Sequence, residues 1–262
     1  MKTICINDQD ISYVETGSGP TLLLLHGFGV GIEIWDHCVE ALSKKYTVIL
    51  LDLPGYGSNK DIVVAPHLKI ISSFVRDFIE KIGSVEYIVG YSMSGLISLD
   101  IAKNPPASVK KIVFVAMPTF ESKNNFAGIV FSLIGKYPTL TSLVCFLVKR
   151  FPVKHILFLL GGLSSIKNPQ AMNECMRKFG IDSRMPYVFT LAAGLFYPTL
   201  LHTSSLPVDF IYGEHDGFAK SSMAKKVMID FTNSNLHVIK GAYHLIPLEK
   251  PQEFSQIVIQ NC

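Results

Sequence analysis

The chain has 262 residues, of which 48% are hydrophobic and 17% charged, and this composition predicts a folded protein with a sizeable core. Its formal net charge of +3 is too small to indicate nucleic-acid binding, and no dense block of lysine and arginine occurs. The five cysteines are scattered without a C-x-x-C pair, so they predict neither a disulfide framework nor a thiolate metal site.

Two segments bear on the location of the protein. The first ten residues, MKTICINDQD, carry acidic residues where a signal peptide would have an apolar run. The most apolar segment, FAGIVFSLIGKYPTLTSLVCFLVKRF, is interrupted by Lys136, Pro138, Lys149 and Arg150, so its apolar runs are shorter than the ~20 residues that a membrane-spanning helix needs. We therefore predict a cytoplasmic protein in a reducing environment, and contact with a membrane is not expected.

Apolar runs alternate with helical patterns through the first 117 residues. Several of the runs are uninterrupted, which is typical of strands buried on both faces of a sheet. The helix expected over 68–82 has Ile70, Phe74, Phe78 and Ile82 at helical spacing, on one face. The predicted strands cover residues 3–6, 11–15, 21–25, 46–52, 85–90 and 110–116, and the predicted helices cover 35–46, 68–82 and 96–104.

The alternation stops after Met117. Up to about Ser205, apolar residues recur at helical spacing between prolines and glycines, and no strand pattern is seen. Strands are predicted again at 207–213 and 235–240, with helices near 219–228 and from about 251. Strands that alternate with helices predict an α/β fold. We expect a mostly parallel, doubly wound sheet of about eight strands, formed by residues 1–117 and 206–262, with an inserted all-helical cap over 118–205.

The stretch VGYSMSGL, residues 89–96, carries a candidate nucleophile. It follows a predicted strand, precedes a predicted helix and matches the turn G-x-S-x-G at every position except the last glycine. Gly90 would let the strand and the helix approach closely, and Ser94 is small enough for the position of the second glycine. With Ser94 as nucleophile, Leu96 would occupy a small-residue position, so Ser92 is the better candidate. The motif alone also fits a serine that merely caps a helix.

A serine hydroxyl needs a base, and a carboxylate that orients the base, to act as a nucleophile at neutral pH. Of the eight histidines, His244 alone follows a strand end late in the chain, in GAYHLIPLEKP. Asp216 lies in the polar turn GEHDGF after another predicted strand. Glu214 is a rival for the acid, but Asp216 lies farther into the loop and is favoured. A carboxylate that only caps the next helix is the alternative reading of Asp216.

The reaction also needs N–H donors for the charge that develops on a carbonyl oxygen. The segment HGFG, residues 26–29, follows the strand at 21–25 and can turn the backbone amide of Phe28 toward the site. The amide of Met93, directly after Ser92, would supply the second donor. The sequence has neither a metal-ligand cluster nor a phosphate-binding G-x-x-x-x-G-K motif, so we expect no cofactor and no metal.

Together these motifs resemble the α/β-hydrolase fold family. The segments that carry the resemblance, from about Thr21 to the C-terminus, are HGFG, DLPGYGSN, GYSMSG, YGEHD and GAYHLIPLEKPQEF. The resemblance implies that Ser92 attacks and forms an acyl-enzyme, and that His244 acts first as base and then as acid. It further implies that Asp216 orients His244, and that the amides of Phe28 and Met93 form the oxyanion hole.

The resemblance also bears on the kind of relative. A serine at position 92 disfavours relatives with an aspartate nucleophile, such as haloalkane dehalogenases and epoxide hydrolases. Ser94 is similar to the elbow of plant strigolactone and karrikin receptors, which leaves a signalling role open. The family also includes enzymes that cleave esters, thioesters, lactones, N-terminal peptide bonds and C–C bonds.

The cap segment favours one of these reactions. It is rich in Phe, Leu, Ile and Val, so we predict a carboxylesterase that acts on a small-molecule ester with an apolar acyl or alkyl group. An aminopeptidase would need cap carboxylates, for which the segment offers Glu121, Glu174 and Asp182, and a C–C bond hydrolase would need a cation, for which it offers Arg177 and Arg184. Both stay as alternatives, together with a hydrolase-like ligand sensor with slow turnover. A homodimer through exposed cap aromatics is also left open.

Overall fold

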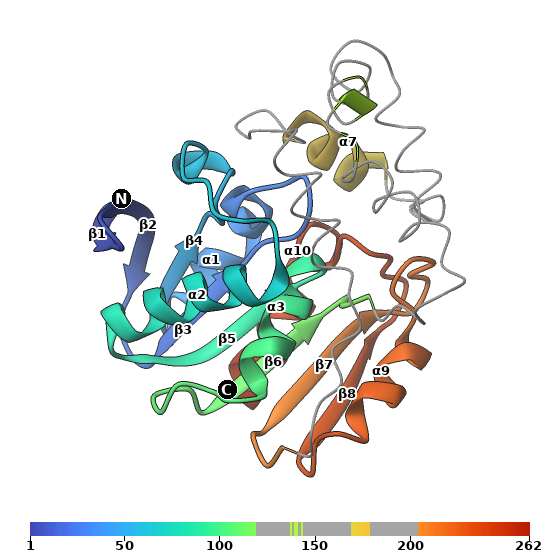
Figure 1. Ribbon diagram of the computed structural model, residues 1–262. Helices are drawn as coiled ribbons and strands as arrows, with labels where there is room; N and C mark the ends of the chain where they lie inside the picture. The colour runs from blue at the N-terminus through green and yellow to red at the C-terminus, as the bar shows by residue number, and fades with distance from the viewer. Residues whose placement is uncertain (119–136, 138, 141–142, 144–168, 179–203) are drawn as a thin grey trace.

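A single eight-stranded sheet organises the protein (Figure 1). The computed structural model describes residues 1–118, 137, 139–140, 143, 169–178 and 204–262. The predicted fold class and number of strands are confirmed, because the sheet has eight strands and only β2 runs antiparallel to its neighbours, β1 and β4. In spatial order the strands are β1 (Lys2–Ile6), β2 (Gln9–Gly17), β4 (Thr47–Leu51), β3 (Thr21–Leu25), β5 (Val85–Tyr91), β6 (Lys111–Val115), β7 (Val208–Gly213) and β8 (Ser234–Ile239).

Helices cover both faces of the sheet. The helix pair α2 and α3 packs together in front of the sheet in Figure 1, and the pair α1 and α11 packs together behind it. This arrangement is expected for parallel strands joined by helical crossovers. The helical segments are η1 (Ile32–Trp35), α1 (Asp36–Leu42), η2 (Gly57–Asn59), α2 (Leu68–Ile82), α3 (Met93–Ala102), α7 (Pro169–Lys178), α9 (Ser221–Met228), α10 (Ile246–Glu249) and α11 (Pro251–Asn261).

The register of the parallel strands brings their C-terminal ends together at one edge. Leu25 of β3 is paired with Gly90 of β5, and the next residue of β5, Tyr91, is paired with Val115 of β6. On the other side, Gly213 of β7 is paired with Ile239 of β8. Loops that follow these strands therefore meet at the same edge, which is where ligand sites form in open parallel sheets.

The core of the sheet follows the apolar runs of the sequence. All five residues of β3 and all six of β7 are buried. Helix α2 has the predicted bounds and ends at Gly83, whose φ of 77° is readily adopted by glycine. Of the residues placed on one face of α2, Phe74 and Phe78 are buried, whereas Ile70 is 43% exposed. Ile71 and Val75, one position further along the helix than Ile70 and Phe74, are buried as well.

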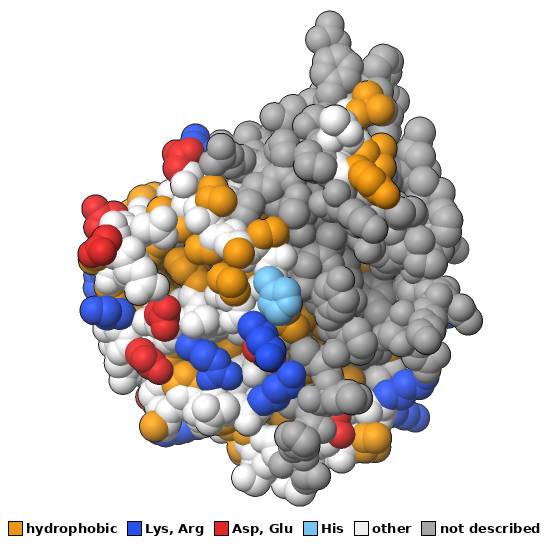
Figure 2. Space-filling view, in the orientation of Figure 1, with side chains coloured by type: hydrophobic (Ala, Val, Ile, Leu, Met, Phe, Trp, Pro, Cys, Tyr) orange, Lys and Arg blue, Asp and Glu red, His pale blue; other side chains and the backbone are white. Residues whose placement is uncertain are grey.

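Most of the predicted cap, 118–205, lies outside the described residues, so its boundaries stay a prediction. Its described part includes helix α7, where Ala171 and Cys175 are buried and Glu174 contacts His37 of α1. Hydrophobic side chains lie on the face shown in Figure 2. Within the predicted cap, Leu140 and Leu143 are exposed. No helix within the described ranges is long and apolar enough to cross a membrane.

Candidate active site

Ser92 lies at a sharp turn between β5 and α3. It is the last residue before the helix and has φ of 50° and ψ of −113°, a conformation that residues other than glycine seldom adopt. The turn is fixed on both sides, because the Ser92 N–H donates to the carbonyl of Val115 at 2.8 Å and the Gly95 N–H donates to the carbonyl of Ser92 at 2.9 Å. The predicted strand–turn–helix context of this serine is therefore present.

Close packing explains the glycine two residues before Ser92. A Cβ atom on Gly90 would lie 2.3 Å from the hydroxyl oxygen of Ser98 and 2.6 Å from the carbonyl oxygen of Ser94. These distances are too short for any side chain, so strand β5 and helix α3 can approach each other this closely only at a glycine.

Ser94 has a polar contact in addition to its small size. Its side chain is buried, and its hydroxyl donates a hydrogen bond to the backbone carbonyl of His26, in the turn after β3. The hydroxyl thus joins the turn that holds Ser92 to the segment HGFG. Sequence reasoning gave Ser94 only a steric role, because the partner is a backbone atom far away in the chain.

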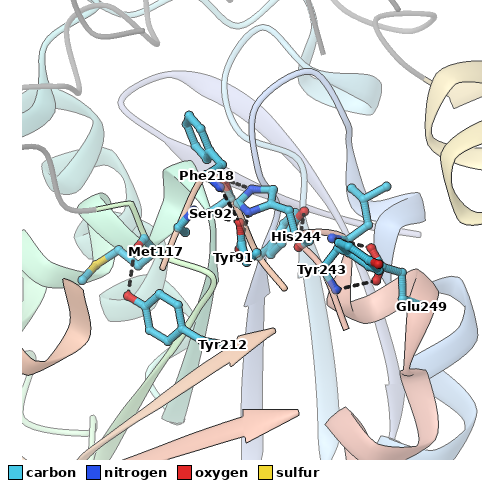
Figure 3. A network of polar contacts seen from close by, with 11 residues as sticks. Tyr91, Ser92, Met117, Tyr212, Phe218, Tyr243, His244 and Glu249 are labelled. Carbon is cyan, nitrogen blue, oxygen red and sulfur yellow. Dashed lines mark hydrogen bonds and ion pairs between the residues drawn. The ribbon is translucent and has the colours of Figure 1, made fainter. Parts of the chain in front are cut away.

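Ser92, His244 and Asp216 form one hydrogen-bonded line, of which Figure 3 labels Ser92 and His244. The hydroxyl oxygen of Ser92 lies 2.9 Å from His244 Nε2, and His244 Nδ1 lies 2.8 Å from Asp216 Oδ2. A carboxylate only accepts hydrogen bonds, so Nδ1 carries the proton and Nε2 is free to accept the proton of the serine hydroxyl. The three residues are 5–7% exposed, so bulk water has little access to this line.

The two oxygens of Asp216 have different partners. Oδ2 accepts from His244, and Oδ1 accepts from the backbone N–H groups of Phe218 and Ala219, at 2.8 Å each. Asp216 therefore holds the loop after β7 and contacts the histidine. The residue before α9 is Lys220 and no side chain caps this helix, so the reading of Asp216 as a helix cap was wrong. The rival acid Glu214 accepts from the backbone of Gly241 and is exposed.

Aromatic rings enclose the imidazole of His244. The ring of Phe218 meets it edge-on, with ring centres 5.2 Å apart, and the ring of Tyr91 lies 5.6 Å away. The Tyr91 hydroxyl also donates to the backbone carbonyl of His244 at 3.2 Å. Tyr91 is the variable residue of the G-x-S motif, so no motif could have assigned it this contact.

The segment HGFG lies against the turn that holds Ser92. A Cβ on Gly27 would meet the Tyr91 ring at 2.9 Å and the Cβ of Ser92 at 3.2 Å, so only glycine allows this approach. His26 is buried and holds the segment from behind: its Nε2 accepts the Leu53 N–H at 2.9 Å, and its Nδ1 lies 2.9 Å from the carbonyl oxygen of Gly27. Burial lowers the pKa of His26, although the charge of Asp52 raises it in part. The lowered pKa keeps Nε2 an acceptor. The structure thus brings Phe28 and Met93 to adjoining turns.

Comparison with known proteins agrees with this architecture. A family model described as alpha/beta hydrolase fold matches residues 20–137. A pimeloyl-[acyl-carrier protein] methyl ester esterase of Proteus mirabilis is 28% identical over 258 residues, which cover 94% of each chain. Among solved structures, a thermophilic esterase from Thermogutta terrifontis has a TM-score of 0.79 at 18% identity and covers 99% of this chain and 97% of its own. An epoxide hydrolase of Bacillus megaterium has a TM-score of 0.76 at 20% identity and covers 99% of both chains.

The chain has the α/β-hydrolase fold. The fold assigns the architecture, and the two solved structures, an esterase and an epoxide hydrolase, illustrate that one fold carries more than one chemistry. In this protein, the side chain at the turn after β5 is a serine hydroxyl. The reaction must therefore be argued from the site itself.

Proposed function

We propose that this protein is a serine ester hydrolase that cleaves a carboxylic ester of an apolar acyl or alkyl group. The observation that carries the proposal is the line of hydrogen bonds from the Ser92 hydroxyl through His244 to Asp216. This arrangement is what a neutral hydroxyl needs in order to become a nucleophile without a cofactor. The name of the Proteus mirabilis relative, a methyl ester esterase, supports the ester as the bond that is cleaved.

The first half of the proposed reaction forms an acyl-enzyme. The Ser92 oxygen attacks the ester carbonyl carbon while its proton passes to His244 Nε2. The negative charge that develops on the carbonyl oxygen is held by the backbone N–H groups of Phe28 and Met93. His244 then gives its proton to the departing alkoxide, so that an alcohol leaves and the acyl group stays on Ser92.

The second half repeats these steps with water. His244 takes a proton from a water molecule, whose oxygen attacks the acyl carbon, and the proton then returns to the Ser92 oxygen as the acid leaves. Asp216 keeps Nδ1 protonated and stabilises the positive charge that the imidazole carries in both halves. Each proton is moved by a group of this chain.

The proposed substrate class rests on the apolar composition of segment 118–205 and on the relatives. Of the cap residues considered for other reactions, Arg177 is exposed and Glu174 contacts His37, while Arg184, Glu121 and Asp182 lie outside the described residues. No contact within the described part of the chain favours the C–C hydrolase or the aminopeptidase. A small-molecule apolar ester in the cytoplasm is therefore our proposal, and the homodimer and the absence of membrane and nucleic-acid contacts stay predictions.

Steady-state turnover of a panel of p-nitrophenyl and methyl esters of increasing acyl length tests the proposal. We expect many turnovers per enzyme, and we expect Ser92→Ala to reduce kcat by at least about 10⁴-fold, because the nucleophile is lost. A single stoichiometric release of product, without further turnover, would instead identify a ligand sensor. Full activity in Ser92→Ala would refute the assignment of the nucleophile.

A further inference from the structure

Glu249 makes two contacts that the proposed reaction has not yet used. It is the last residue of the single-turn helix α10, and its carboxylate points back to the loop before that helix (Figure 3). Oε2 accepts the backbone N–H of Tyr243 at 2.7 Å, and Oε1 accepts the backbone N–H of Leu245 at 3.0 Å. One carboxylate thus holds the peptide groups of the residues on both sides of His244.

The same short segment is held from other directions as well. The Tyr91 hydroxyl donates to the His244 carbonyl, and the Leu245 carbonyl accepts the N–H groups of Leu248 and Glu249 at 2.9 Å each. These contacts fix the main chain on both sides of His244, while Asp216 and the ring of Phe218 hold the imidazole itself. The bonds from Glu249 therefore act on the imidazole through the main chain from which it extends.

We propose that Glu249 is a positioning residue for the proposed ester hydrolysis: its ionised carboxylate keeps the backbone around His244 in the geometry that aligns the imidazole between Ser92 and Asp216. The inference rests on the proposed function. An ionised carboxylate offers an acceptor on each oxygen, whereas a protonated carboxyl group or an amide presents a hydrogen on one side. Only the ionised form can hold both N–H groups well.

The electrostatic surroundings make this contact sensitive to pH. Burial raises the pKa of Glu249, and the charge of Asp216 raises it further, whereas the two N–H bonds and the positive charge of His244 lower it. Tyr91, which feels the charge of Glu249, stays neutral because burial raises its pKa well above the ordinary value of 10. Protonation of Glu249 therefore starts at a higher pH than for an exposed glutamate, and it replaces one of the two acceptors by a donor.

The test compares Glu249→Gln with Glu253→Gln, which makes the same change on an exposed carboxylate of α11. For Glu249→Gln we expect kcat at pH 7.5 to fall about 10- to 100-fold with KM changed less than about 3-fold, because a small displacement of a catalytic group costs rate more than binding. As the pH is lowered through the pKa of Glu249, the ratio of wild-type to variant kcat should shrink, since the wild-type residue becomes protonated. Glu253→Gln should match the wild type at every pH.

Two outcomes would overturn the inference. One is an unchanged kcat in Glu249→Gln, and the other is a loss of kcat whose ratio to wild type is constant with pH, as an ordinary loss of packing would give. If Glu249→Gln does not fold, Glu249→Asp takes its place in the test. This variant keeps the charge but has a shorter side chain, so a kcat equal to that of wild type would refute the inference. The ratio of wild-type kcat to Glu249→Asp kcat should change little with pH.

A second measurement separates this inference from the proposed function. The rate at which a fluorophosphonate labels Ser92 depends on the alignment of His244 but not on turnover of any ester. If the wild type turns over no ester while Glu249→Gln still slows labelling, the proposed function fails and the positioning role stands. If the wild type is an active esterase and Glu249→Gln labels at the wild-type rate, the positioning role fails alone.

Discussion

Ser94 occupies the place where the G-x-S-x-G motif has its second glycine. Its hydroxyl donates to the His26 carbonyl, so it joins the segment that carries Phe28 to the turn that carries Met93. The serine thus adds a hydrogen bond between the two segments that carry the proposed oxyanion donors.

Removal of this hydroxyl should slow the reaction without harming substrate binding. In Ser94→Ala and Ser94→Gly we expect kcat to fall about 5- to 10-fold, the equivalent of about 1 kcal/mol for one lost hydrogen bond, with little change in KM. The matched control is Ser98→Ala in the same helix, because the Ser98 hydroxyl has no hydrogen-bond partner among the described residues. Equal kcat values for Ser94→Ala and wild type would show that the contact does not position the donors. Affinity for a boronic acid inhibitor should fall in parallel with kcat.

At the scale of elements, a buried ion pair joins strands β6, β7 and β8 near their N-terminal ends. Asp209 of β7 is buried and contacts Lys111 at 2.7 Å, Asn235 at 2.9 Å and His237 at 3.7 Å. Burial alone would raise the pKa of Asp209, but its interactions with these three side chains outweigh burial and lower the pKa. This cluster lies at the opposite end of the strands from Ser92, so its role is in stability.

Asp209→Asn should destabilise the fold without affecting the site. It leaves the Lys111 ammonium, which is 13% exposed and also donates to the Asn261 carbonyl, beside a neutral group, and we expect the free energy of unfolding to fall by about 3 kcal/mol. Because the folded-state pKa of Asp209 is depressed, its stabilisation is present above the unfolded-state pKa and is lost as the pH falls through the folded-state pKa. Urea unfolding at pH 7 measures the free energy of unfolding of Asp209→Asn and of wild type. As a control, Glu40→Gln, which breaks an exposed ion pair with Lys44, should change the free energy of unfolding by less than about 1 kcal/mol.

At the scale of the whole molecule, apolar runs and breakers were enough to predict the sheet, because strands buried on both faces must be apolar throughout. The order of Ser92, Asp216 and His244 along the chain, each just after a strand, predicted that the three would meet at one sheet edge. The contacts of Ser94 and Tyr91 could not be predicted, because their partners are backbone atoms of segments that only the fold brings close. Those of Glu249 are with backbone atoms of the adjoining loop, and no sequence motif assigns them. The choice between Asp216 and Glu214 likewise needed coordinates.

The stability of the whole molecule should depend on pH through His26. The unfolded chain takes up a proton at this residue near its ordinary pKa of 6.5, whereas in the folded protein burial lowers the pKa. Its contribution to stability is therefore fully present above pH 6.5 and is lost as the pH falls below that value toward the folded-state pKa. The proton would also convert the acceptor of the Leu53 N–H into a donor.

His26→Gln tests this dependence, because the amide oxygen can still accept the Leu53 N–H but cannot be protonated in this range. We expect the variant to be less stable than wild type at pH 7 and to lose less stability between pH 7 and pH 5, as measured by urea unfolding at each pH. His67→Gln, at the start of α2 and on the surface, should follow the wild-type curve. If the stability of wild type and of His26→Gln fell in parallel with pH, the imidazole would take up its proton as readily in the folded protein as in the unfolded chain. The loss of stability in acid would then come from other groups.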